Sequence, residues 1–118
     1  LAAYLRKSFA TGQGFLFGFG ANPDFKDSSL NVAYATQGGL GLPDRDYYLG
    51  DRPDYKKARE GYVAHVARML ELSGVEAGAA ATQAKAVMAF ETRLAKASLS
   101  SEELSRDVSK YYNPVSLE

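Results

Sequence analysis

The sequence contains no cysteine, no tryptophan and a single histidine in 118 residues. Without cysteine the chain can form no disulfide, no thiolate nucleophile and no cysteine-ligated zinc site. A zinc site on one helix commonly uses two histidines one turn apart, and this chain has only His65. The chain therefore cannot build a conventional zinc site by itself. We expect His65 to lie half-buried at the flank of its helix.

Charge of one sign and long apolar runs are also missing. Fourteen basic residues balance fourteen acidic residues, and the basic ones are scattered apart from Lys56-Lys57. No net field therefore attracts nucleic acid, which we exclude as a partner. No apolar run approaches the roughly 20 residues that span a bilayer, so we expect no membrane segment in this chain. The 46% apolar and 24% charged fractions are typical of a globular protein.

The length corresponds to one domain with one core. The first residue, Leu1, lies in a helix-like pattern without an initiator Met, and we interpret the chain as a piece of a larger protein. Leu117-Glu118 fits native sequence and a tag remnant equally well.

The spacing of apolar residues predicts the secondary structure. Residues 2–10, 54–72 and 76–98 carry apolar side chains at intervals of three and four, which indicates amphipathic helices. Two short apolar runs at residues 15–20 and 30–37 predict an antiparallel strand pair joined by a polar loop. The predicted fold class is mainly α (α+β), with helices dominating.

The densest polar motif is "GLGLPDRDYYL", residues 39–49. Its Gly-x-Gly lacks the third glycine of a dinucleotide fingerprint, because Asp44 stands at that position, and no Gly-Lys-Ser/Thr follows. The glycines are therefore not predicted to cradle phosphate. We expect Gly39, Gly41 and Pro43 to turn the chain out of the strand pair.

The same motif holds two carboxylates, Asp44 and Asp46, two residues apart. Paired carboxylates can serve acid/base catalysis, but such pairs usually come from separate elements. Adjacent ones on a turn more often accept backbone N–H bonds. We favour that structural role, with Tyr47 and Tyr48 packed at the junction with the helices.

Glu91 is the most unusual single position. It projects between Val87 and Leu94 in the apolar stripe of its helix, where an unpaired carboxylate would be costly. It could be a catalytic glutamate, or one half of an interior ion pair. We favour the ion pair and predict that Glu91 is largely buried and bonded to Arg106 or Arg59.

Four linked motifs, in order, resemble the N-terminal lobe of neprilysin-like zinc metallopeptidases, the group that includes endothelin-converting enzymes and bacterial oligopeptidases. "GGLGLPDRDYYL" is similar to the family's "GLGLP-x-RDYY" signature, and "YVAHVARMLELSG" and "VMAFETRLAKAS" resemble its next two helices. "RDVSKYYNP" resembles its closing segment, and the run "LFGFGANPDFKDSSLNVAYATQGG" resembles its strand pair. The resemblance covers nearly the whole chain.

The resemblance implies a parent enzyme that hydrolyses peptides with a zinc ion held by H-E-x-x-H and a distal Glu. No position here matches those ligands, and "NVAY" departs from the family's substrate-gripping Asn-Ala-aromatic strand, so no catalytic, metal or substrate residue is transferred. This segment is then part of the mostly helical lobe that encloses the active-site cavity, limits substrates to peptides and is inactive alone. Its implied partners are the remaining lobe of the same polypeptide and peptide substrates. Family membership implies an extracytoplasmic location, periplasmic or cell-envelope, and the missing cysteine fits a bacterial member.

Two other hypotheses remain open. One is a non-enzymatic helical domain that binds peptide or carbohydrate with an aromatic face, although we expect these rings to form a core. That face would consist of Phe15, Phe17, Phe19, Tyr47 and Tyr48. The other is a free-standing hydrolase that uses Asp44, Asp46 or Glu91.

Overall fold

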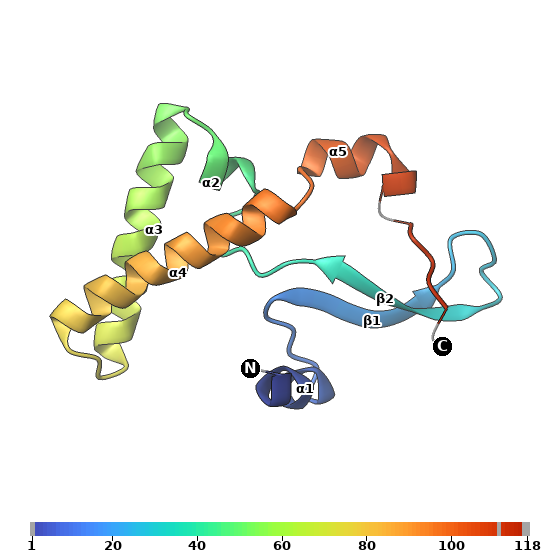
Figure 1. The fold of residues 1–118 in the computed structure, drawn as a ribbon, viewed down its shortest axis with the longest axis horizontal. Coiled ribbons are helices and arrows are strands. Elements are labelled where there is room, and N and C mark those ends of the chain that lie inside the picture. Colours follow the sequence, from blue (N-terminus) through green and yellow to red (C-terminus); the bar gives the residue numbers. More distant parts are fainter. Residues whose placement is uncertain (1, 111, 117–118) are drawn as a thin grey trace. The chain divides into compact units, whose positions relative to one another are not determined.

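The computed structural model describes residues 2–110 and 112–116, so the expectations for Leu1 and for Leu117-Glu118 lie outside the described residues. The chain forms two compact units where its length predicts one core. The helical unit is Leu40–Ser100, and the ribbon unit combines Leu1–Gly39 with Ser101–Glu118. Figure 1 labels the elements of both units.

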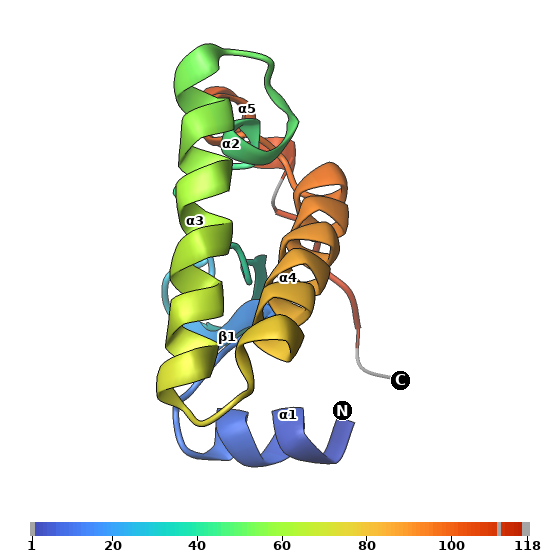
Figure 2. The ribbon, with the colours of Figure 1, turned by 90° about the vertical axis from the view of Figure 1, so that its left-hand side faces the viewer.

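The helical unit consists of a helical hairpin and a short helix at its open end. The one-turn helix α2 spans Asp46–Leu49, α3 spans Pro53–Leu72 and α4 spans Ala77–Ala97. Figures 1 and 2 show α3 and α4 lying side by side, with α2 near the start of α3 and the end of α4. The two long helices agree closely with the predicted ranges.

Local sequence determines where these helices begin and end. Pro53 occupies the first turn of α3, where its missing N–H has no intrahelical partner to lose. At the other end, Gly74 adopts φ 97°, and its N–H donates to the carbonyl of Glu71 at 2.9 Å. This left-handed residue is a typical helix stop. Glu76 then caps α4, because its Oε2 accepts the N–H of Ala79 at 3.0 Å.

The core of the helical unit is made of small residues and one large ring. Ala80, Ala84 and Ala95 of α4 are completely buried, and Tyr48 of α2 is 5% exposed. Larger apolar side chains remain partly accessible, and Met69, in the predicted stripe of α3, is 53% exposed. Alanine allows close helix approach but buries little apolar area, so the apolar stabilisation of this unit is modest.

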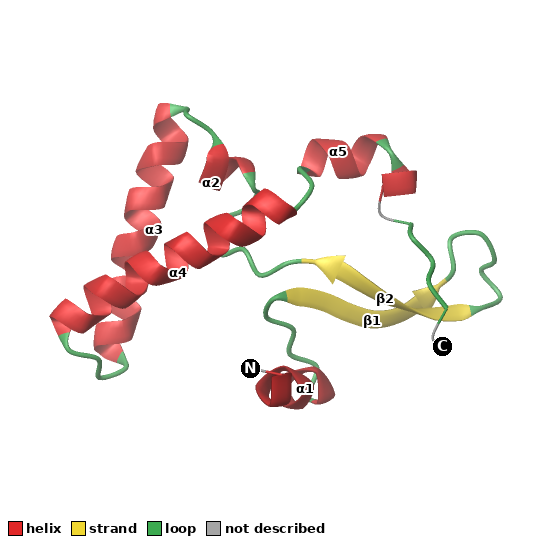
Figure 3. Cartoon of the chain, in the orientation of Figure 1, coloured by secondary structure: helices red, strands yellow, loops and turns green. Residues whose placement is uncertain are grey.

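The ribbon unit contains the small sheet. Helix α1 spans Ala2–Ala10, and strands β1 and β2 span Phe17–Pro23 and Asn31–Gln37. Helix α5, Ser101–Arg106, and the 3₁₀ turn Val108–Lys110 follow. Figure 3 shows the two strands as one antiparallel ribbon. The predicted fold class, mainly α with a short antiparallel strand pair, is confirmed.

The register of the ribbon corrects one strand boundary. Phe17 pairs with Gln37 and Pro23 pairs with Asn31, so β1 begins later and ends later than the predicted range 15–20. Asn22-Pro23-Asp24 follows the predicted strand directly, and because proline usually ends a strand the predicted range stops before it. In a two-stranded ribbon each strand has one unpaired edge, and a proline at the end of such a strand loses no ladder hydrogen bond.

The ribbon's loop is closed by an aspartate. Oδ1 of Asp24 accepts the N–H groups of Lys26 and Asp27 at 2.7 and 3.1 Å, which forms a compact turn. The hydroxyl of Tyr112 donates to both oxygens of the same carboxylate, at 2.9 and 3.1 Å. These bonds attach the end of the described chain to the loop of the ribbon.

Candidate functional site

Glu91 lies at the centre of a buried hydrogen-bond cluster in the helical unit. The residue is 8% exposed, and its Oε2 accepts the Tyr48 hydroxyl at 2.5 Å and the Gly41 N–H at 3.1 Å. Its Oε1 accepts the Tyr62 hydroxyl at 2.9 Å. Three donors from three different segments therefore satisfy one carboxylate, and such charge-assisted bonds are stronger than neutral ones. We call Gly41, Tyr48, Tyr62 and Glu91 the Glu91 cluster.

The two phenols of the cluster are held neutral. Burial, followed by the hydrogen bond to Glu91, raises the pKa of Tyr62 to about 12. The same two causes, in the same order, raise the pKa of Tyr48 well above its usual value. The Tyr48 oxygen also accepts the Leu42 N–H at 2.8 Å, so a chain of bonds runs from backbone to phenol to carboxylate. Each phenol is therefore fixed as a donor to Glu91.

The predicted ion pair of Glu91 is corrected. Glu91 is buried as expected, but Arg59 does not supply its counter-charge. Arg59 Nη1 donates instead to the carbonyls of Tyr47 and Gly50, at 2.6 and 3.0 Å. Arg106 belongs to the ribbon unit, where its exposed guanidinium pairs with Glu102. Neutral phenol and amide donors satisfy the carboxylate without burying a second charge.

The tyrosines of this cluster were missed as partners because sequence reasoning looked for a counter-charge. Tyr62 lies in the apolar stripe of α3, and Tyr48 was expected only to pack at the junction. The sequence did contain a signal for these partners: Tyr48 and Tyr62 are tyrosines, so each combines an apolar ring with a hydroxyl that can donate to a buried carboxylate. Tyrosines buried in this way usually find a hydrogen-bond partner.

Two arginines hold the ends of the corner motif. Arg45 Nη1 donates to the Ser98 carbonyl at 2.9 Å, just past the end of α4. Arg59, on α3, binds the last carbonyls of α2 as described above. Tyr47 packs against Tyr55 with ring centroids 4.7 Å apart. The corner is therefore attached to both long helices by side-chain bonds.

The glycines of the motif have separate steric reasons. Gly39 adopts φ 79°, and an added Cβ there would lie 2.9 Å from Leu16 Cα, so only glycine fits. At Gly41 an added Cβ would overlap the hydroxyl of Tyr62, which occupies the space beside the backbone. Gly41 thus allows its own N–H and the Tyr62 hydroxyl to reach the same carboxylate.

The remaining predicted residues lie at the surface of the corner or of its helix. Oδ1 of Asp44 accepts the N–H of Asp46 at 2.9 Å, and the Asp46 carbonyl accepts the Gly50 N–H at 2.8 Å. Pro43 is exposed in the bend that precedes α2. His65 is also exposed, so the expectation of a half-buried histidine is wrong.

The chemistry of the Glu91 cluster is that of a structural clamp. Its carboxylate accepts three hydrogen bonds, and its phenols donate to it. Within residues 2–110 and 112–116, no three His, Cys, Asp or Glu side chains come together at a position that could hold a metal ion. The donor set of this chain, one exposed histidine and no cysteine, therefore does not fit the zinc site that the sequence resemblance implies.

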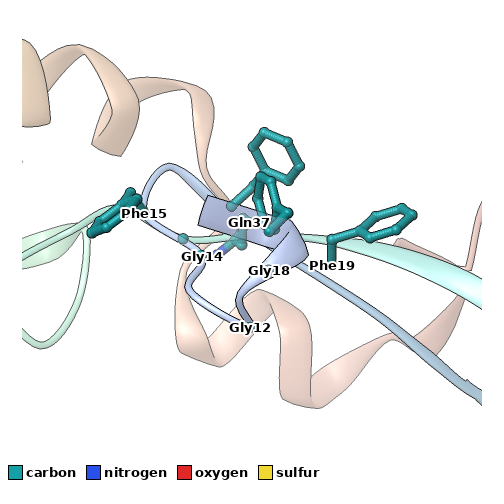
Figure 4. Close-up of a pocket in the computed structure, with 10 residues that line it drawn as sticks. Gly12, Gly14, Phe15, Gly18, Phe19 and Gln37 are labelled. Atoms are coloured by element: carbon teal, nitrogen blue, oxygen red, sulfur yellow. The ribbon is translucent and has the colours of Figure 1, made fainter. Parts of the chain in front are cut away.

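A second candidate site is a pocket in the ribbon unit, between α1 and the start of β1. Its volume is about 440 Å³, and its walls include Phe9, Phe15, Phe17, Phe19 and Gln37 with several glycines. Figure 4 shows Phe15 and Phe19 at the two ends of the pocket with Gln37 between them. The Phe9 ring lies 4.8 Å from that of Phe17 and 6.2 Å from that of Phe19.

Only three of the five residues of the predicted aromatic face, the phenylalanines, line this pocket. Phe15, Phe17 and Phe19 are 45%, 38% and 60% exposed, so they do not form the core that we expected. Tyr48, by contrast, is buried in the helical unit, and its hydroxyl is committed to Glu91. The single face of five aromatic residues is therefore wrong, and the accessible aromatic surface belongs to the phenylalanines.

No helix in the described part of the chain has the length and apolar character needed to cross a membrane.

Comparisons with known proteins agree over the whole sequence. Residues 1–118 match the model described as Peptidase family M13. An endothelin-converting enzyme homolog of Locusta migratoria is 39% identical over 119 residues, covering 97% of this chain and 16% of that protein. Neprilysin-3 of Drosophila melanogaster is 32% identical over 102 residues, covering 86% of this chain and 13% of that protein.

Solved structures show the same relationship in three dimensions. The zinc metalloprotease ZMP1 of Mycobacterium tuberculosis, in its open state, matches 96% of this chain with a TM-score of 0.83 and 35% identity. The match uses 17% of the ZMP1 chain, so our sequence spans about a sixth of the length of its relatives. The chain belongs to peptidase family M13 and corresponds to the N-terminal segment of these neprilysin-like metallopeptidases.

Proposed function

We propose that this chain is part of the N-terminal lobe of a zinc-dependent metalloendopeptidase. The observation that carries the proposal is the family match over residues 1–118, supported by 35% identity to a zinc metalloprotease of known structure. In this proposal the parent polypeptide hydrolyses peptides, and its zinc ligands lie outside the 118 residues. When bound there, zinc would polarise the scissile carbonyl and activate water.

The role proposed for this segment is to help enclose the active-site cavity and so limit substrates to peptides. A wall of that kind acts by steric exclusion and needs rigid backbone rather than reactive side chains. The Glu91 cluster supports this role, because it ties the corner to α3 and α4 through satisfied hydrogen bonds, one buried and two part-buried. By itself the segment is proposed to be inactive.

A bacterial parent and an extracytoplasmic location, periplasmic or in the cell envelope, complete the proposal. The similarity to a Mycobacterium tuberculosis protein and the absence of cysteine support the bacterial assignment. Disulfides are common in secreted animal proteins, and this segment has none to offer.

The test uses the full-length parent protein. Its hydrolysis of internally quenched peptides is expected to disappear with a zinc chelator and to return when zinc is added back. Peptides are expected to be cleaved while folded proteins carrying the same cleavage sequence in an exposed loop are spared, because the enclosed cavity excludes them. Turnover that resists the chelator would refute the zinc proposal, and equal cleavage of the folded protein would refute the enclosing role.

The alternative is a non-enzymatic binding role for the aromatic pocket of the ribbon unit. The exposed Phe15, Phe17 and Phe19 around a pocket of about 440 Å³ favour it. Pockets lined by aromatic rings often bind apolar ligands. This alternative predicts that an added peptide or carbohydrate protects the pocket in the parent protein, whereas the main proposal needs no such ligand.

A further inference from the structure

One face of the β-ribbon is apolar and mostly uncovered. Because side chains alternate along a strand, Phe17, Phe19 and Ala21 of β1 share a face with Ala33 and Ala35 of β2. All five are exposed in this chain. The described contacts of this face with α1 come from the single ring of Phe9, which packs on Phe17 and Phe19.

Such a ribbon needs a further layer. A two-stranded sheet is marginally stable in water, and stability usually requires a third strand or a packed element on its apolar face. Antiparallel sheets normally place their apolar face on a core and their polar face in solvent. Here the apolar face, which such a sheet would normally bury, is accessible, so the described residues leave it without a covering layer.

The accessible area of the whole chain, both units included, is large for its mass. It measures 8682 Å². Two separate compact units of half this mass would together expose only about 7,600 Å² by the scaling of surface with mass. The excess of roughly 1,100 Å² exceeds the ~800 Å² that each partner buries in a standard protein interface.

We propose that this ribbon face, with the pocket beside Phe9, is the docking surface for an apolar, uncharged segment from the rest of the same polypeptide. No charged side chain lines the pocket or occupies the five positions of the face, so the occupant should present aliphatic or aromatic groups. This sequence covers only 16% and 17% of two relatives, so a parent of similar length would contain many further segments able to dock here. The proposal rests on the proposed function in one respect, that this chain is a segment of a larger peptidase.

Phe19 and Phe25 provide a matched test. They are the same residue type in the same unit, Phe19 on β1 and Phe25 in the loop after it, and are 60% and 59% exposed in this chain. Phe19 lines the pocket, whereas Phe25 lies beyond β1 and contacts the rings of Tyr34 and Tyr112. Docking on the ribbon face would cover Phe19 and leave Phe25 accessible.

The experiment is hydroxyl-radical oxidation of the wild-type full-length parent, read by mass spectrometry at each phenylalanine. Phe19 is expected to react at least fivefold more slowly than Phe25, and both should react alike after unfolding in urea. Equal rates in the native parent would overturn the proposal. Protection of Phe19 that vanishes on dilution would overturn it too, because the occupant would then be a second copy.

A pair of variants checks the same surface independently. Phe19→Asp is expected to lower the melting temperature of the parent by several degrees, and Phe25→Asp by clearly less. Peptide hydrolysis by the wild-type sample separates the two proposals. Protection of Phe19 in a parent without zinc-dependent hydrolysis would refute the proposed function alone, and hydrolysis with an unprotected Phe19 would refute the docking alone.

Discussion

The helical unit and the ribbon unit use their unusual residues in opposite ways. In the helical unit a buried carboxylate, Glu91, which is only 8% exposed, is satisfied by the buried phenol of Tyr48 and the part-buried phenol of Tyr62. In the ribbon unit large aromatic rings remain accessible, and Phe19 is 60% exposed. The Glu91 carboxylate, which was expected to be costly to bury, finds its hydrogen-bond donors inside its own unit. The phenylalanines, which were expected to form a core, are not buried inside theirs.

This difference explains which residues make the sequence recognisable. Gly41, Arg45 and Tyr48 of the corner motif each bond to a residue more than 40 positions away in the sequence. A motif with several such distant contacts tolerates little change at these positions, because one substitution leaves polar groups without their hydrogen-bond partners. The exposed rings of Phe15, Phe17 and Phe19 line a pocket instead, and the docking surface proposed above would give them a comparable role.

The largest effect is expected from removing the carboxylate at the centre of the cluster. Glu91→Leu would leave two phenol hydroxyls and one N–H without an acceptor, and each unsatisfied buried group costs about 1–3 kcal/mol. The opening free energy of α4 should fall by about 3 kcal/mol or more, measured by native-state hydrogen exchange in the parent. Glu60→Leu, at an exposed position of α3, is the control and should change it by less than about 0.5 kcal/mol. Equal effects of the two variants would show that the cluster does not hold the helical unit together.

A pair of glycine substitutions compares the two units at the backbone. In Gly41→Ala the new methyl would overlap the Tyr62 hydroxyl, and overpacking of this kind typically costs about 1–3 kcal/mol. In Gly20→Ala, on β1, the methyl meets nothing within 4 Å, so the change should be neutral or slightly stabilising. Hydrogen exchange of α3 and of β1 measures both effects. A loss of stability in Gly20→Ala as large as that in Gly41→Ala would contradict the steric argument.

The sequence predicted the helices better than it predicted the boundaries of the sheet. Residues 54–72 and 76–98 were recoverable because their apolar period, Pro53 and Gly74 are all local signals. The first strand was misplaced because Pro23 reads as a breaker, and its tolerance depends on the strand having an unpaired edge. That fact concerns pairing between distant residues, which a local pattern does not contain.

The candidate site was half predictable for a related reason. The helical wheel places Glu91 inside, and the structure agrees. The predicted partners, Arg59 and Arg106, were wrong because only an opposite charge was considered sufficient to offset the burial of a carboxylate. The donors that reach a buried carboxylate depend on how three segments pack together. The sequence positions of Tyr48 and Tyr62 do not by themselves predict that they bond to Glu91. The exposed phenylalanines failed as core residues because, within the described residues, Phe17 and Phe19 pack on the ring of Phe9 and stay 38% and 60% exposed.

A smaller effect is expected from deleting one hydroxyl and from raising the pH. Tyr62→Phe removes one hydrogen bond to Glu91, which should cost about 1 kcal/mol. The pKa of Tyr62 is raised to about 12 in the folded chain, against about 10 when unfolded. Between these values the unfolded chain has lost its proton while the folded chain keeps it, so stability is full below pH 10 and falls as the pH rises toward 12. Denaturation curves of the parent from pH 9 to 11 should show this loss, and it should be weaker in Tyr62→Phe. Identical pH slopes for the two proteins would contradict the role assigned to this phenol.

The smallest effect belongs to the ribbon unit, where the bond between Tyr112 and Asp24 is only part-buried. The N–H of Lys26 and then the Tyr112 hydroxyl hold the pKa of Asp24 below its usual value. Tyr112→Phe removes the second of these donors, so the pKa of Asp24 should rise toward normal, as measured by carboxyl NMR of the labelled parent. A lowered carboxyl pKa contributes stability above the unfolded value that is lost as the pH falls, so the variant should lose less stability on acidification. Because the pair lies within the ribbon unit, hydrogen exchange of α3 and α4 at neutral pH should not change. A shift in those helices would mean that the two units are coupled more strongly than their separate hydrogen bonds require.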